Sequence, residues 1–125
     1  MKSLRELEEG DNMLIVKVAP KGISEQMVQI IDWFDFKHNN GFSKILYFEV
    51  DGRRKSVTAS DDKAYKVVDV DSLEDRLEYG NIIYCIDSFD YKDVAREVVK
   101  NLREEFSDYL EIFQETIEEL DKLEI

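Results

Sequence analysis

Several short segments of this chain have the residue pattern of β-strands, and two of them flank a turn dipeptide. Residues 13–19 (MLIVKVA) are apolar at neighbouring positions, which predicts a central strand. Residues 44–50 (KILYFEV) and 53–59 (RRKSVTA) flank Asp51-Gly52, the dipeptide favoured in type I′ hairpin turns. We therefore expect a hairpin at this point of the chain.

Two further runs are predicted to be strands. Residues 65–70 (YKVVDV) follow the hairpin after a short polar turn, so we expect them to add a third strand to its meander. Residues 81–87 (NIIYCID) form an apolar run after Gly80 and are predicted to be a buried strand. The sequence thus predicts four to five strands in one sheet.

Three shorter segments carry helix signals. Ser3 and Glu6 fit a capping box, and Gly10 would end that helix. Ser24 precedes apolar residues at helical spacing, which predicts a second helix over residues 24–34; these are Met27, Ile30, Ile31 and Phe34. A similar capping signal at Ser72 predicts a short third helix that Gly80 closes.

The C-terminal part of the chain has the pattern of a long amphipathic helix. From Asp90 onward there is no Pro or Gly, and apolar residues follow each other at three- and four-residue steps: Val99, Leu102, Phe106, Tyr109, Phe113, Leu120 and Leu123. A helix of roughly 33 residues would be about 50 Å long, which exceeds the diameter of a domain of this size. A break near Ser107 would give a helical hairpin, and an unbroken helix would offer its far end to a second copy in a homodimer.

These elements predict an α+β fold. We expect residues 1–125 to form a single domain with a mostly antiparallel sheet, resembling a βαββαβ plait with one inserted strand and covered by helices. Residues 90–125 are expected to pack on this domain or to project from it. Neither the strand order nor the oligomeric state follows from the sequence.

Length and composition favour a cytoplasmic protein with one core. The chain has 125 residues, 43% of them hydrophobic, which is enough to build a single domain. It has one cysteine, and its first residues lack the apolar segment of a secretion signal, so we expect a reducing compartment. No apolar run approaches the roughly 18 residues that a membrane-spanning helix needs.

Charge is the least ordinary feature of the sequence. The net charge is −12, which disfavours direct binding to nucleic acid or to anionic membranes and favours a basic protein partner. Residues 104–125 hold nine acidic residues and one basic residue, and so contribute −8 of this charge. Five of the acids recur at helical spacing and form what we call the acidic ridge: Glu104, Asp108, Glu111, Glu115 and Glu118.

Carboxylates at these positions lower the stability of a helix, because like charges lie one turn apart and oppose the helix dipole near its C-terminal end. Repeated violation of a local rule suggests a function. In composition the chain is similar to the acidic decoy proteins with which phages and mobile elements block nucleases and DNA-binding proteins, although it carries no motif of such a family. The sequence therefore favours an inhibitor that mimics nucleic-acid charge, and the alternative is a solvated face that keeps the protein soluble.

Apolar surfaces give a second hypothesis for function. Trp33, Phe34 and Phe36 could leave an aromatic patch after the second predicted helix, with Trp33 and Phe36 as the expected contacts, and Phe113 and Leu120 lie on the apolar side of the C-terminal helix. An immunity protein, an antitoxin or a regulatory interaction module would bind through such residues. Arg53-Arg54-Lys55 is predicted to decorate an edge strand and to deter its pairing with other chains.

Signals for catalysis are weak. Cys85 lies in an apolar run, where it is expected to be a small core residue, and His38 is the only histidine that could serve as its base. Glu49 and Asp51 could hold a metal in a small hydrolase, but the turn already explains Asp51. We therefore predict no catalytic, cofactor-binding or metal-binding residue, and the hydrolase is kept as the remaining alternative.

Overall fold

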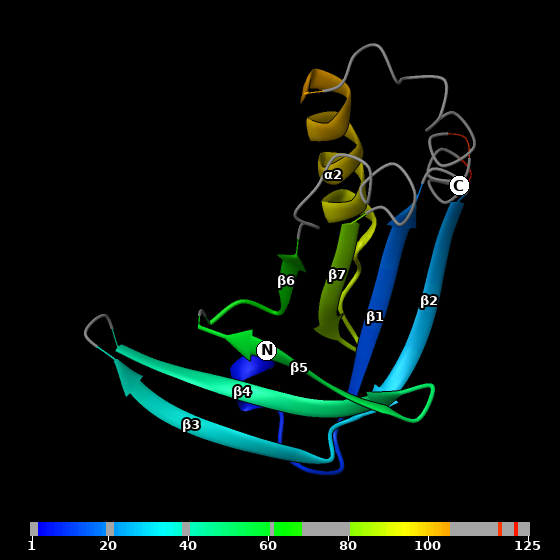
Figure 1. Cartoon of the computed structure of the whole chain (residues 1–125). Coiled ribbons are helices and arrows are strands. Elements are labelled where there is room, and N and C mark those ends of the chain that lie inside the picture. The colour runs from blue at the N-terminus through cyan, green and yellow to red at the C-terminus, as the bar shows by residue number, and fades with distance from the viewer. Residues whose placement is uncertain are drawn as a thin grey trace. The chain divides into compact units, whose positions relative to one another are not determined.

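The computed structural model describes residues 3–19, 22–38, 41–60, 62–68 and 81–105, together with Glu118 and Lys122 (Figure 1). Within these five ranges the helical elements are η1 (Leu4–Glu6), one turn of 3-10 helix, and α2 (Lys92–Glu105). The strands are β1 (Asn12–Ala19), β2 (Gly22–Gln29), β3 (Asp32–His38), β4 (Gly41–Val50), β5 (Arg53–Ala59), β6 (Tyr65–Val68) and β7 (Asn81–Ile86). No helix among the described residues is long and apolar enough to cross a membrane.

The seven strands form two sheets. One has the order β2-β1-β7-β6 and the other the order β3-β4-β5. The arrows of neighbouring strands point in opposite directions in both sheets (Figure 1). The prediction of an α+β fold with mostly antiparallel strands is confirmed, but the prediction of one sheet with four to five strands is wrong. The predicted C-terminal helix or helical hairpin lies outside the described residues beyond Glu105, apart from Glu118 and Lys122.

The hairpin predicted around Asp51-Gly52 is confirmed. Strands β4 and β5 pair antiparallel, with Val50 opposite Arg53 and the two turn residues between them. Asp51 has φ of 53° and Gly52 has φ of 77°, as a type I′ turn requires at both central positions. The sequence thus fixes the register of this half of the three-stranded sheet.

The predicted helix over residues 24–34 is wrong. Residues 22–29 form β2, and residues 32–38 form β3, which pairs antiparallel with β4. Met27, Ile30, Ile31 and Phe34 fit helical spacing, but the same segment is rich in the β-branched and aromatic residues that favour strands. Short apolar runs of this kind are compatible with either element, and pairing with β4 decides the outcome.

The predicted meander also needs a correction. Strand β6 covers part of the run assigned to a third strand, but it lies beside β7 in the four-stranded sheet and not beside β5. The chain leaves the three-stranded sheet after Ala59, and the backbone N–H of Ile86 donates to the carbonyl of Ala64 at 3.0 Å. The strand predicted over residues 81–87 is confirmed as β7. The helix predicted from Ser72 lies outside the described residues.

The first helical element is shorter than predicted. The backbone N–H of Ser3 donates to Oε2 of Glu6 at 3.0 Å, which is the contact expected of a capping box. The element nevertheless ends after one turn, because Leu7 is already extended with φ of −68° and ψ of 138°. Gly10 has φ of 92° and lies in the turn that leads into β1, so it does not end the helix.

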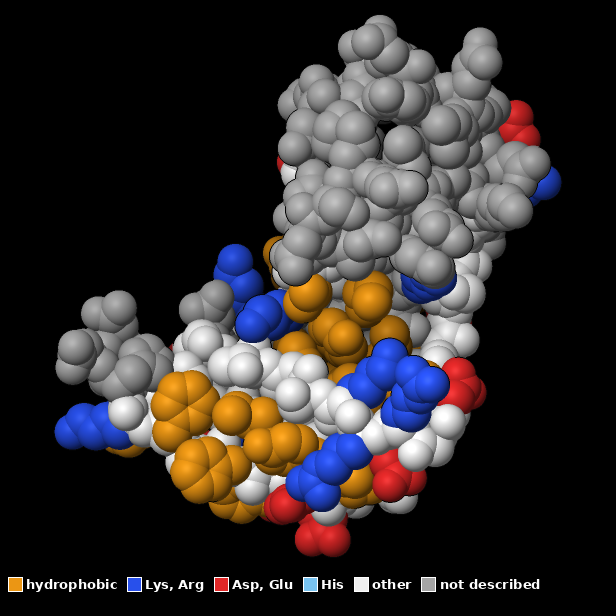
Figure 2. Space-filling view, viewed as in Figure 1, with side chains coloured by type: hydrophobic (Ala, Val, Ile, Leu, Met, Phe, Trp, Pro, Cys, Tyr) orange, Lys and Arg blue, Asp and Glu red, His pale blue; other side chains and the backbone are white. Residues whose placement is uncertain are grey.

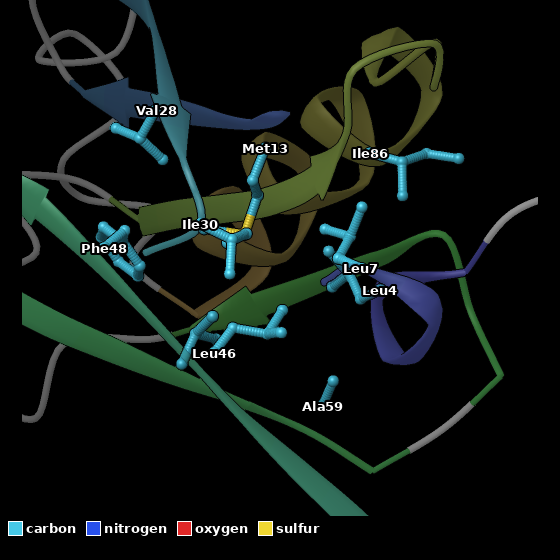
Figure 3. Close-up of a cluster of buried hydrophobic side chains, with 10 residues drawn as sticks. Leu4, Leu7, Met13, Val28, Ile30, Leu46, Phe48, Ala59 and Ile86 are labelled. Carbon is cyan, nitrogen blue, oxygen red and sulfur yellow. The ribbon is translucent and has the colours of Figure 1, made fainter. Parts of the chain in front are cut away.

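The chain divides into two compact units, and strands β1, β2, β6 and β7 pass from one to the other. Unit 1 consists of Met1–Ile15, Gln26–Lys66 and Tyr84–Phe89. Its core is a cluster of buried side chains from η1, both sheets and the segments between them (Figure 3): Leu4, Leu7, Met13, Val28, Ile30, Leu46, Phe48, Val57, Ala59 and Ile86. One face of the three-stranded sheet therefore belongs to the core of unit 1.

Unit 2 consists of Val16–Glu25, Val67–Ile83 and Asp90–Ile125. Its described buried apolar residues come from β1, β7 and one face of α2: Val16, Val18, Ile83, Ala95, Val98 and Val99. The helix predicted from Asp90 is confirmed as far as Glu105, and the carboxylate of Asp90 accepts from the backbone N–H of Lys92 at 3.1 Å. Capping of this kind satisfies a backbone donor that has no partner within the helix.

Candidate protein-binding surface

The three-stranded sheet has one face in the core and one outer face. Leu46 and Phe48 of β4 are fully buried, so the side chains that alternate with them point to the other side. The register of β3 and β5 against β4 then defines the outer face by these residues: Asp32, Phe34, Phe36, Ser43, Ile45, Tyr47, Glu49, Arg54, Ser56 and Thr58.

Apolar side chains form the centre of the outer face. Phe34 is opposite Ile45, and Ile45 is opposite Thr58, so the three lie in one row across the sheet. Phe34 is 58% exposed, while Phe36 and Ile45 are half-buried. In the view of Figure 2, hydrophobic side chains gather over this sheet, with Lys and Arg side chains among them. An exposed aromatic ring among apolar neighbours is the kind of group that anchors protein interfaces.

Polar contacts cross all three strands at one end of the outer face. The Arg54 guanidinium of β5 lies with its Cζ 4.5 Å from the centre of the Tyr47 ring of β4. Its Nη2 is 3.4 Å from Oδ2 of Asp32, which is opposite Tyr47 on β3. Both charged side chains are more than half exposed, so the contribution of each contact to stability is at most about 1 kcal/mol. The contacts do position the polar side chains at this end of the outer face.

The opposite face of the same sheet also carries exposed aromatic rings. Phe42 is 56% exposed and has Nζ of Lys37 at 5.9 Å from its ring centre. Trp33 is 39% exposed, with Nζ of Lys44 at 4.4 Å from its ring centre. Lys44 is itself buried.

The structure places two residues of the predicted apolar site on opposite faces of one strand. Trp33 and Phe36 were expected to expose rings at the end of a helix, but both lie in β3, where odd and even positions face opposite ways. Phe36 belongs to the outer face and Trp33 to the other, and Phe113 and Leu120 lie outside the described residues. Sequence reasoning included Phe34 in an aromatic patch but did not place it opposite Ile45 on one face of a sheet. The alternation of DWFDFKH and KILYFEV was the signal that could have located it.

The acidic ridge is only partly within the described residues. Glu104 lies in the last turn of α2, and Glu118 is helical and exposed. Asp108, Glu111 and Glu115 lie outside the described part of the chain. The alignment of these five carboxylates on one ridge therefore stays a prediction.

The residues considered for catalysis are separated in the fold. Cys85 is fully buried in β7, and its Sγ is 3.8 Å from the carbonyl oxygen of Leu14, as expected for a core cysteine. Glu49 is exposed on the outer face, while Asp51 occupies the positive-φ position of the turn. Within the part of the chain that the structure describes, no three His, Cys, Asp or Glu side chains are grouped so that they could hold a metal ion.

Comparison with known proteins adds no relative. No family model, curated protein or solved structure matches the chain.

Proposed function

We propose that this chain is a protein-binding module that holds a basic protein against the outer face of its three-stranded sheet. The observation that carries the proposal is the 58% exposure of Phe34 beside the half-buried Phe36 and Ile45. Protein interfaces typically have an aromatic, apolar centre surrounded by polar residues. Here Asp32 and Arg54 supply such a margin at one end of the face.

The charge of the chain indicates the class of partner. A net charge of −12 repels phosphate and attracts a basic protein over distances of about a Debye length. On the outer face itself, the carboxylates of Asp32 and Glu49 would lie close to a bound protein. A basic protein with an apolar patch would satisfy both the charge and the aromatic centre. Such a module would act as an immunity protein, an antitoxin or a regulatory subunit, without catalysis of its own.

A matched pair of substitutions tests this proposal. The tagged chain is used to capture host proteins, and the retained basic proteins are compared among the wild type, Phe34→Ser and Phe42→Ser. Phe34 and Phe42 have nearly equal exposure but lie on opposite faces of one hairpin. The proposal expects one basic protein to be retained by the wild type and by Phe42→Ser and lost with Phe34→Ser. Equal retention by all three chains contradicts it.

A second candidate function rests on the uneven distribution of charge. Residues 104–125 contribute −8 of the net −12, and Glu118 within them is exposed on a helix. We propose as the alternative that the acidic ridge occupies the basic groove of a nucleic-acid-binding protein in place of its substrate, so that the chain acts as an inhibitor or decoy. Binding of this kind is fast and sensitive to salt.

Charge reversal separates this alternative from the first proposal. Replacing Glu111, Glu115 and Glu118 with Lys reverses the charge at three of the five ridge positions, and positive charges near the C-terminal end of a helix interact favourably with its dipole, so folding should be retained. The decoy function expects the triple variant to lose binding and the wild type to release its partner between about 0.1 and about 1 M salt. Unchanged binding by the triple variant, together with loss of binding by Phe34→Ser, would reject the decoy and favour the outer face.

A further inference from the structure

Strand β5 forms one border of the three-stranded sheet (Figure 1). The two residues that flank the turn of the β4–β5 hairpin exchange backbone hydrogen bonds, and every second pair along the strands does the same. The backbone groups of the residues in between, which are Arg54, Ser56 and Thr58, therefore point away from β4. In agreement with this assignment, the carbonyl oxygen of Thr58 accepts a hydrogen bond from Nζ of Lys66.

The first half of this border is open to another strand. Within the described part of the chain, β4 is the one strand beside β5, and no backbone hydrogen bond from another segment reaches Arg54 or Ser56. Both residues therefore present an N–H and a C=O group at the border, and the side chains of residues 53–56 are all exposed. A border of this kind can accept an extended segment of another protein as an additional strand.

Cationic side chains lie along the same border. Arg53 and Lys55 are two residues apart, so they lie on one face of β5 at a spacing of about 7 Å. No ion pair within the described ranges involves either of them. Nζ of Lys66 adds a further positive charge at Thr58. These charges would repel a second β5 strand, which is the role predicted for them from the sequence, and they would attract an acidic strand.

We propose that β5 binds an acidic extended segment of another protein, which pairs antiparallel with it and becomes the fourth strand of this sheet. Acidic residues at every second position of the segment lie opposite Arg53 and Lys55, with Cβ atoms about 4.5–5.5 Å apart. The residues between them lie opposite Arg54 and Ser56 and exchange backbone hydrogen bonds with these two. Backbone pairing supplies affinity for any extended segment, and the cations select an acidic one.

This site is separate from the surface proposed for a basic protein. Arg53 and Lys55 lie on the same face of β5 as the buried Val57, whereas Phe34 lies on the outer face and in β3, at the other border of the sheet. The proposal therefore does not rest on the proposed function. Phe34→Ser should leave the binding of an acidic segment unchanged, so failure of one proposal can be told from failure of the other.

Fluorescent peptides in which Glu alternates with Val test the backbone pairing. The Val residues would lie opposite Arg54 and Ser56, so N-methylation of every Val removes hydrogen bonds and should weaken binding by about tenfold or more. The N–H groups of the Glu residues point away from β5, so their N-methylation should change the dissociation constant by no more than about threefold. Fluorescence anisotropy with the full chain measures each affinity. Equal losses from both modifications, or no binding of the unmodified peptide at the highest soluble concentration, would overturn the proposal.

Charge reversal tests the class of the segment. The double variant Arg53→Glu/Lys55→Glu should bind the Glu peptide about tenfold more weakly or worse and should instead bind a peptide in which Lys alternates with Val. Both side chains are exposed, so the variant should fold, which circular dichroism checks. Lys37→Glu, an exposed position in β3, is the matched control and should leave binding unchanged. Equal binding of the Lys peptide and the Glu peptide by the wild type, or an unchanged affinity of the double variant for the Glu peptide, would contradict the proposal.

Discussion

Phe34 and Phe42 lie on opposite faces of the hairpin formed by β3 and β4, and they are exposed to nearly the same extent, 58% and 56%. Neither ring contributes much to the core, so Phe34→Ser and Phe42→Ser should each change the free energy of unfolding by no more than about 0.5 kcal/mol. Urea denaturation of the two variants measures this directly. A loss of several kcal/mol in either would show that its ring is part of the fold.

Leu46 and Ile45 give the corresponding contrast within β4. Leu46 is fully buried in the core of unit 1, and Ile45 is half-buried on the outer face. We expect Leu46→Ala to lower the free energy of unfolding by about 2–5 kcal/mol, because it leaves a cavity among Phe48, Val57 and their neighbours. Ile45→Ala is the control and should cost clearly less. Equal losses for the two would contradict the assignment of faces, and urea denaturation again provides the measurement.

Gly52 is required by backbone conformation and not by lack of space. Its φ is 77°, and a Cβ built on it would have no heavy atom within 4 Å. Gly52→Ala should therefore lower the free energy of unfolding by about 1–2 kcal/mol through left-handed strain alone. Gly52→Asn should cost less, because Asn tolerates this region of φ and ψ. Thermal denaturation of both variants tests the ranking, and a harmless Gly52→Ala would refute the type I′ turn.

Ionisation of the Tyr84 phenol should make the free energy of unfolding depend on pH in the alkaline range. Its ring packs at 5.9 Å from that of Phe48, and burial raises the pKa of the Tyr84 phenol. The folded state thus favours the neutral phenol. Its contribution is complete below the unfolded pKa of about 10 and is lost as the pH rises through the higher folded pKa. Tyr84→Phe should make the free energy of unfolding less dependent on pH above about 10. An unchanged slope in denaturation at several alkaline pH values would contradict this.

The elements that the sequence predicted correctly are those whose residues are compatible with only one type of secondary structure. The Asp51-Gly52 turn fixed a two-residue hairpin, and the apolar runs of β1 and β7 were too short for helices. The cap at Asp90 likewise located the start of α2. In each case a local signal and the apolar pattern agreed.

The region from Gly22 to His38 could not be assigned in the same way. Its apolar residues satisfy both periods, and strand pairing over long sequence separations decided between them. The helical spacing of residues 24–34 predicts that Trp33 and Phe36 share one patch, whereas alternation along a strand separates them. The outer face combines residues from three strands, so it appears only when the register is known.

The most direct test of the account is the affinity of the captured basic protein for three purified chains: the wild type, Phe34→Ser and Phe42→Ser. An aromatic anchor at the centre of an interface is worth about 2 kcal/mol or more, so Phe34→Ser should raise the dissociation constant about 30-fold while Phe42→Ser leaves it within about twofold. Titration calorimetry measures all three. Equal affinities for the three chains would show that the outer face is not the binding surface.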